Sequence, residues 1–143
     1  MNTGFTRVVI LKGRGLVKGV AIGTALVSRD PISFYGGVDS ESGLVVEKGH
    51  QLEGAYVTGK VLVFPRGKGS TVGSYVLYRL RKLGKAPAAI INVETEAIIV
   101  TGCILAGIPL VDRLDKNPLE VIRTNDVVRV NGSKGLVEVL KKA

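Results

Sequence analysis

The sequence contains one cysteine, Cys103, one histidine, His50, and no tryptophan. A single cysteine excludes a disulfide within the chain, and the two residues together exclude a zinc or iron–sulfur site built by this chain alone. Any such metal must therefore be held by a partner. No apolar run reaches the ~18 residues of a membrane span, and residues 1–15 lack the features of a signal peptide. We therefore expect a cytoplasmic protein.

Negative charge is in the minority, because 20 Lys and Arg stand against 12 Asp and Glu and give a net charge of +8. The basic residues are scattered from Arg7 to Lys142 without a block of like charge. Aromatic residues make up only 5% of the chain and offer few platforms for base stacking. A basic binding module for nucleic acid is thus a weak hypothesis. A basic surface for an acidic substrate or partner subunit explains the charge at least as well.

The pattern along the chain predicts one domain, residues 1–143, that is mostly short strands separated by glycine. We expect strands at 7–12, 20–28, 43–48, 60–64, 88–93, 97–102 and 108–112, a helical turn near 103–107, and a hairpin within 125–140. One helix is clear, because apolar residues follow helical spacing from Val72, Gly84 suits its end and Pro87 prevents continuation. The predicted fold is α/β and β-rich, with a barrel-like or sandwich-like core.

The stretch FPRGKGSTVGSYVLYRL, residues 64–80, leads from a strand through a glycine-rich loop into that helix. A Walker loop requires lysine directly before the hydroxyl residue, and here Gly69 separates Lys68 from Ser70. The dinucleotide fingerprint also fails, because the spacing to Gly73 is one residue too long. The loop still favours an anion, through the N–H groups of the first helical turn and the charges of Arg66 and Lys68. Ser70 is then either a helix cap or a serine whose alkoxide is stabilised.

Four segments together resemble the small subunit of the aconitase X group of dehydratases, in the archaeal branch that acts on 5-phosphomevalonate. They are FYGGVDSESG (34–43), GKVLVFPRGKGSTVGSYVLYRL (59–80), GKAPAAIIN (84–92) and TGCILAGIPLVD (101–112). The resemblance spans nearly the whole chain, and GKGSTVGSY is its most specific part. It implies a swivelling β/β/α domain related to the mobile domain of aconitase.

The resemblance also implies a reaction and a partner. The reaction is the loss of water from (R)-5-phosphomevalonate to give trans-anhydromevalonate 5-phosphate, in a modified mevalonate pathway for isoprenoid biosynthesis. The partner is a large subunit that binds a [4Fe–4S] cluster through its own cysteines, and its iron would act as Lewis acid toward the departing hydroxyl. We expect this chain to be inactive without that subunit.

Carried over residue by residue, the family's catalytic serine falls on Ser70, which would remove the proton beside the substrate carboxylate. Aconitase has an arginine directly after its corresponding serine pair, whereas this chain has Thr71 and Val72 there. Arg66 or Lys68 would have to replace that arginine. The expected substrate-binding residues are Arg66, Lys68, Gly69 and Thr71.

Three alternatives remain open. A related aconitase X branch dehydrates hydroxyproline derivatives, and residues of the large subunit would decide between the branches. The stretch TGCILAGIPLVD is also similar to phosphohistidine domains, but the reactive histidine that precedes it in those domains is absent here. A purely structural or regulatory subunit is the third alternative, and the intact GKGST loop argues against it.

Five further residues are expected to have structural rather than chemical roles. Asp39 follows two glycines and is expected in a turn, and His50 is expected at the surface or an interface. Cys103 is expected to pack as a small apolar residue. Glu94 and Glu96 would share one solvated face of a strand.

Overall fold

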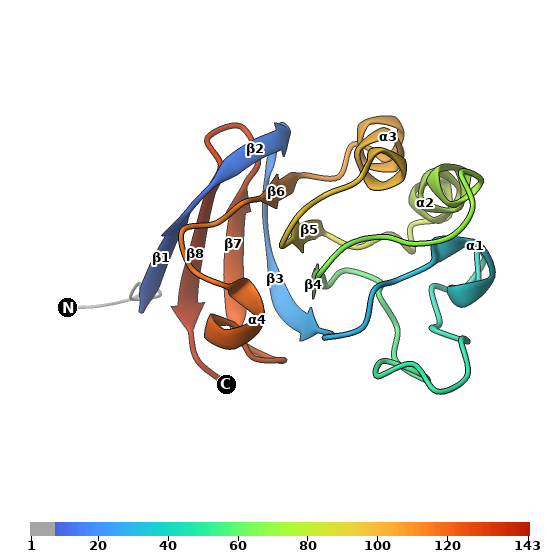
Figure 1. Cartoon of the computed structure of the whole chain (residues 1–143), viewed down its shortest axis with the longest axis horizontal. Helices are drawn as coiled ribbons and strands as arrows, with labels where there is room; N and C mark the ends of the chain where they lie inside the picture. The colour runs from blue at the N-terminus through green and yellow to red at the C-terminus, as the bar shows by residue number, and fades with distance from the viewer. Residues whose placement is uncertain (1–7) are drawn as a thin grey trace.

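A computed structural model describes residues 8–143 (Figure 1). The elements in chain order are β1 (Val9–Lys12), β2 (Arg14–Val17), β3 (Val20–Val27), α1 (Phe34–Gly37), β4 (Val61–Phe64), α2 (Gly73–Lys82), β5 (Ala89–Asn92), α3 (Ala97–Ala106), β6 (Leu110–Asp112), α4 (Pro118–Val121), β7 (Val127–Asn131) and β8 (Leu136–Lys141). Within the described residues no helix is long and apolar enough to cross a membrane.

The strands form one mixed sheet in the order β1-β8-β7-β3-β4-β5-β6-β2. The strands from β3 to β6 are parallel, and the other pairs are antiparallel. The two outermost strands, β1 and β2, are separated only by Gly13, whose N–H donates to the Gly135 carbonyl at 2.8 Å. A β-carbon at Gly13 would lie 2.4 Å from the Asp112 carbonyl, so the bend requires glycine. The sheet therefore closes through this bend into the barrel-like core that the sequence predicts.

Two hydrophobic clusters lie on opposite faces of β4 and β5, because successive side chains of a strand alternate between faces. Val61, Val63 and Ile91 face the outer strands β1, β8 and β7, whereas Leu62 and Ile90 face the helices. Figure 1 shows the resulting layers, with the outer strands on the left, β4 and β5 in the middle and α2 and α3 beside them. This is the expected β/β/α arrangement.

The helix predicted from Val72 is confirmed as α2. Its buried side chains follow helical spacing, and Arg79, Arg81 and Lys82 occupy its last turn, where positive charge suits the helix dipole. Gly84 has a φ of +72°, which suits the glycine expected after the helix end. The hairpin around Asn131-Gly132 is likewise confirmed as β7 and β8.

The strand predicted at 97–102 is wrong, because these residues begin helix α3. The run of isoleucine and valine resembles a buried strand, but Glu96 caps the segment by accepting hydrogen bonds from the N–H groups of Ile98 and Ile99. Gly107 ends it in the left-handed conformation. Gly102 packs against α2 so closely that a β-carbon there would lie 2.6 Å from the Leu77 side chain. Tertiary packing thus overrides local β propensity.

The strand predicted at 43–48 is also wrong. Residues 38–59 form turns with only isolated bridges, Val38 with Val45 and Leu44 with Tyr56. Gly43, Gly49 and Gly54 have positive φ values, which interrupt an extended strand. The helices α1 and α4 and the strand β2 are additional elements that the pattern did not predict. Arg7, the first residue of the strand expected at 7–12, lies outside the described residues.

Candidate functional site

The candidate site lies where the parallel strands end. Backbone hydrogen bonds join the segments that follow these strands, because Ile32 N–H donates to the Arg66 carbonyl and Lys68 N–H donates to the Ile32 carbonyl. On the other side, Val93 N–H donates to the Pro65 carbonyl. The loop 65–72 is therefore held between two neighbours at the carboxyl edge of the sheet. Ligands of open α/β sheets bind at this edge.

Two glycines allow the loop to run so close to its neighbours. A β-carbon at Gly67 would lie 2.4 Å from a Glu96 carboxylate oxygen, at the start of α3. Gly69 has a φ of +90°, and a β-carbon there would lie 2.5 Å from the Ser33 hydroxyl oxygen. Both positions therefore require glycine, and the loop that presents Ser70 is defined by close contact on each side.

Ser70 is exposed, and its hydroxyl oxygen accepts a hydrogen bond from the Val72 N–H at 3.1 Å. Its carbonyl accepts a second hydrogen bond from the Gly73 N–H. The sequence left Ser70 as either a helix cap or a reactive serine. The structure shows a cap-like hydrogen bond, which the Ser70 oxygen accepts from the residue just before α2. The same bond also suits chemistry, because an N–H donor favours the negatively charged form of the oxygen.

The N–H donors available to an anion differ from those that the sequence suggested. The first N–H groups of α2 are already bonded to the carbonyls of Ser70, Thr71 and Val72. The N-terminus of α3 is occupied by the Glu96 carboxylate. By contrast, the N–H groups of Gly69, Ser70 and Thr71 have no hydrogen-bond partner among residues 8–143. The N–H donors available to an anion are therefore in the loop itself, on three consecutive residues.

The two basic residues of the loop differ in their surroundings. Lys68 Nζ lies 2.8 Å from a carboxylate oxygen of Glu47, which forms an exposed ion pair across to residues 38–59. The Arg66 side chain is exposed at the carboxyl edge. Thr71 is also exposed, and its carbonyl accepts from both the N–H and the hydroxyl of Ser74. The cap-like side-chain bond is thus made by Ser70 rather than Thr71.

His50 is not at the surface, and that prediction is wrong. Its side chain is buried, and Nδ1 accepts from the Leu52 N–H at 3.0 Å. The proton is therefore on Nε2, which donates to the Pro31 carbonyl at 2.9 Å. Through Pro31, His50 supports the segment that is bonded to Lys68. His50, which lies in the segment 38–59, thus helps to position residues 31 and 32 beside the loop 65–72.

The remaining candidates have structural roles. Asp39 lies in a turn, as expected, and its carboxylate accepts from the N–H and hydroxyl of Ser42. These hydrogen bonds lower its pKa. Cys103 is buried in the apolar core, as expected, and burial raises the pKa of its thiol far above the usual range. Glu94 and Glu96 do not share a strand face, because Glu94 pairs with Arg113 while Glu96 caps α3.

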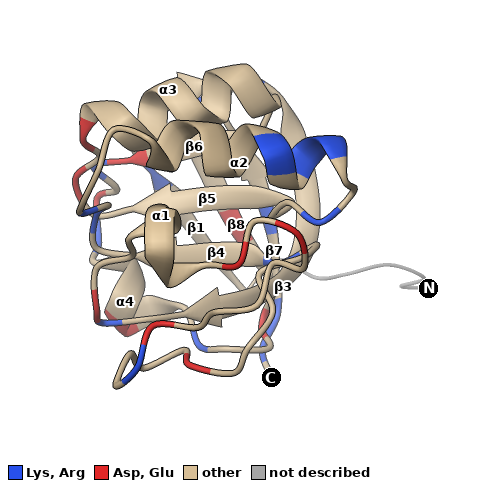
Figure 2. Ribbon diagram, turned by 90° about the vertical axis from the view of Figure 1, so that its right-hand side faces the viewer, with Lys and Arg blue, Asp and Glu red and all other residues tan. Residues whose placement is uncertain are grey.

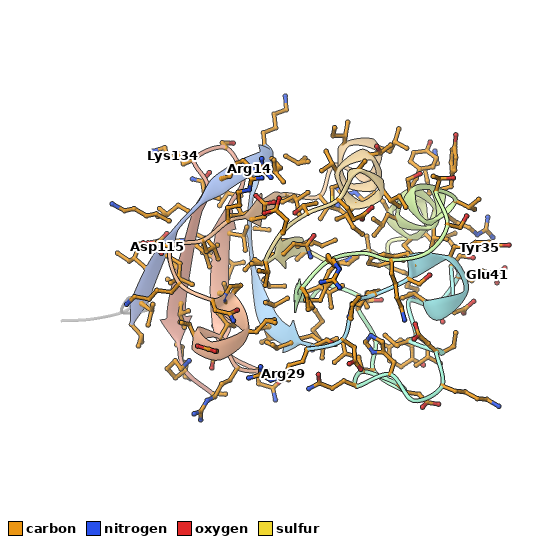
Figure 3. All side chains as sticks on the ribbon, in the orientation of Figure 1. Arg14, Arg29, Tyr35, Glu41, Asp115 and Lys134 are labelled. Carbon is orange, nitrogen blue, oxygen red and sulfur yellow. The ribbon has the colours of Figure 1, made fainter. Side chains whose placement is uncertain are left out.

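A polar cluster at the same carboxyl edge was missed by the sequence reasoning. The Asp112 carboxylate is completely buried, and Arg14 donates to both of its oxygens at 2.9 and 2.8 Å. Burial by itself raises the pKa of Asp112, but the bonds from Arg14 and from the Thr95 N–H outweigh it, so the pKa lies below its usual value. The one sequence feature that could have pointed to this cluster is the position of Asp112, an aspartate at the end of a buried apolar strand. Figure 3 shows Arg14 on β2, on the far side of the molecule from Tyr35 and Glu41.

Charged side chains of both signs are spread over the described residues. Lysine and arginine lie on many elements, interspersed with acidic residues, rather than on one continuous face (Figure 2). No group of three His, Cys, Asp or Glu side chains suited to a metal ion occurs in the part of the chain that the structure describes.

Comparisons with protein families and with curated proteins all point to the same family. The family model of the aconitase X swivel domain matches residues 10–139. The phosphomevalonate dehydratase small subunit of Methanosarcina acetivorans is 59% identical over 131 residues, which cover 92% of this chain and 91% of that one. The protein with the same description from Pyrococcus furiosus is 52% identical over 130 residues, covering 91% and 95%.

Solved structures agree. A crystal structure of Thermococcus kodakaraensis aconitase X in its holo-form has 50% sequence identity and a TM-score of 0.88, covering 93% of this chain and 99% of that chain. A solution NMR structure of a UPF0107 protein has 50% identity and a TM-score of 0.86, covering 93% and 100%.

Proposed function

The chain belongs to the aconitase X swivel-domain family, and on that premise we propose that it is the small subunit of a phosphomevalonate dehydratase in which Ser70 is the base. The relatives that carry this description are archaeal and match over about nine-tenths of both chains. The enzyme is thus a hydro-lyase that converts (R)-5-phosphomevalonate to trans-anhydromevalonate 5-phosphate and water. We take residues 1–143 as one swivel domain.

In the proposed reaction, the Ser70 oxygen accepts a proton from the carbon beside the substrate carboxylate. The electrons of that C–H bond form the double bond as the C–O bond to the adjacent hydroxyl breaks. The departing hydroxide takes up a proton from solvent and leaves as water, and Ser70 returns its proton to solvent before the next turnover, so that each substrate gives one product and one water. The Val72 N–H at 3.1 Å holds the serine oxygen and stabilises its charged form.

The loop amides supply the second part of the proposal. Negative charge on the substrate carboxylate grows as the proton leaves, and the N–H groups of Gly69, Ser70 and Thr71 are donors available to it beside the reacting oxygen. Arg66 and Lys68 supply positive charge at the same edge. Lys68 must then exchange its ion pair with Glu47 for the substrate anion. The observation that supports the proposal most is this grouping of an exposed serine with unpaired backbone donors.

A larger partner is implied by the description "small subunit" of the relatives. Iron–sulfur chemistry is expected of an aconitase X enzyme, but the described residues offer no set of ligands, and Cys103 is buried in the apolar core. The residues from 8 to 143 therefore do not fit a cluster. We therefore assign the [4Fe–4S] cluster to the large subunit and the base to this one.

The test is reconstitution. The chain is coexpressed with the large subunit and assayed without oxygen for conversion of 5-phosphomevalonate, with each subunit alone as a control. We expect turnover only for the pair. Activity toward hydroxyproline instead of 5-phosphomevalonate would assign the chain to the other dehydratase branch. An active isolated subunit would overturn the division of the site between two chains.

A further inference from the structure

A groove runs along one side of α2 and reaches Val72, two residues after Ser70. It has a volume of about 520 Å³ and lies between α2 and the segment 35–46. We call it the Tyr75 groove, after the most exposed of its large side chains, and Tyr35, Val46, Val72 and Arg79 also line it. Figure 3 places Tyr35 and Glu41 together beside α1, on this side of the molecule.

The groove is unusual because it leaves large apolar side chains in solvent. Tyr75 is 66% exposed and Tyr35 56%, while Val46 and Val72 are each 43% exposed. Four such residues on one groove form a patch rather than the scattered apolar residues of an ordinary surface. Figure 2 shows no charged residue on α1 or on the first half of α2, and charge on α2 begins at Arg79.

The charged residues of the groove are already paired within the chain. Arg79 lies 3.4 Å from Glu41, and the Asp39 carboxylate is bonded to Ser42. They are therefore poor anchors for a small ionic ligand. Exposed tyrosine together with arginine, and no lysine, is instead typical of the central part of a protein interface.

The groove is continuous with the proposed catalytic loop. Val72 lines the groove, and its N–H donates to the Ser70 oxygen. The proposed function requires the large subunit to approach Ser70, because the other half of the active site is on that subunit. A protein surface that covers Ser70 from this side meets the Tyr75 groove at the same time.

We propose that the Tyr75 groove is a docking site for an apolar segment of the large subunit. This rests on the proposed function. A segment bound in the groove packs against Val72, whose N–H donates a hydrogen bond to the Ser70 hydroxyl oxygen. Docking and placement of the base are thus coupled through one residue.

Tyr75→Ala tests this, because a side chain so exposed contributes little to folding of the isolated chain. Tyr78→Ala is the matched control, since Tyr78 is on the same helix but does not line the groove, and its ring instead lies near Lys82 Nζ, 5.8 Å from the ring centre. Each variant is titrated into the purified large subunit, and binding is measured by calorimetry alongside dehydration of 5-phosphomevalonate.

We expect Tyr75→Ala to weaken binding to the large subunit at least tenfold. The concentration of small subunit that gives half-maximal activity should rise by the same factor. At saturating concentrations of the variant, most of the native turnover should return. A loss of affinity no larger than that of Tyr78→Ala would overturn the proposal. A second outcome would also overturn it: the small subunit associates with itself, Tyr75→Ala abolishes this self-association, and the affinity for the large subunit is unchanged. Because calorimetry needs no turnover, a wild-type pair that binds but does not dehydrate 5-phosphomevalonate would refute only the proposed function.

Discussion

Lys68 Nζ lies 2.8 Å from a carboxylate oxygen of Glu47, so the lysine of the proposed catalytic loop forms an ion pair with the segment 38–59. An exposed ion pair of this kind contributes only ~0–1 kcal/mol to folding. In the proposed reaction its significance is in binding, since a substrate anion would compete with Glu47 for the ammonium group of Lys68.

Lys68→Ala is expected to raise the KM for 5-phosphomevalonate about tenfold, the effect of losing ~1.4 kcal/mol of anion binding, with a smaller change in kcat. Glu47→Gln is the matched variant, because it breaks the same ion pair but keeps the lysine, and its KM should stay the same or fall. Steady-state kinetics of the reconstituted complex measure both. An unchanged KM in Lys68→Ala would remove Lys68 from the substrate site.

Gly69→Ala is expected to lower kcat by at least an order of magnitude, since displacing a catalytic group by ~1 Å costs on the order of 10²-fold. A methyl group there meets the Ser33 hydroxyl oxygen at 2.5 Å and forces the loop to move. Gly54→Ala is the control, because Gly54 has a similar φ of +87° but faces open space.

Both glycine variants carry a backbone strain of roughly 1–2 kcal/mol, and Gly69→Ala adds the close contact with Ser33, so thermal unfolding should show a loss of stability at Gly69 at least as large as that at Gly54. Equal activity of the two complexes would show that the position of the loop at Gly69 does not matter to catalysis.

Asp112 should make the fold sensitive to acid. Because its pKa is lowered in the folded chain, its contribution to stability is complete above the unfolded value of about 3.9 and is lost as the pH falls through the lower folded value. Asp112→Asn should therefore be less stable than the native chain at neutral pH, and the difference should shrink below about pH 4. Urea unfolding at a series of pH values measures this. A difference that is constant with pH would contradict the assigned ion pair with Arg14.

The sequence predicts the parts of the site that are local in the chain. The strand that ends at Phe64, the glycine loop and helix α2 follow one another, and propensity, turn chemistry and helical spacing all agree there. The assignment of Ser70 as the base came from the family resemblance, because spacing alone left it undecided between a cap and a reactive group.

The parts that could not be predicted depend on contacts between distant segments. Arg14 and Asp112 are 98 residues apart in the chain, and no local pattern pairs them. His50 looked like a surface residue because its bond to Pro31 depends on the path of loop 38–59. The residues of α3 form a helix because Gly102 allows close packing on Leu77, a contact that β propensity does not register.

The central claim is that Ser70 is the base, and Ser70→Ala in the reconstituted complex tests it most directly. Ser133→Ala is the matched control, because the Ser133 oxygen also accepts a backbone N–H at 3.1 Å, from Gly19. Both variants should assemble with the large subunit and lose similar stability. We predict that Ser70→Ala lowers kcat by on the order of 10²–10⁴-fold, the contribution of a general base, while Ser133→Ala retains native turnover. A Ser70→Ala complex that retains a substantial part of the native kcat would contradict the account.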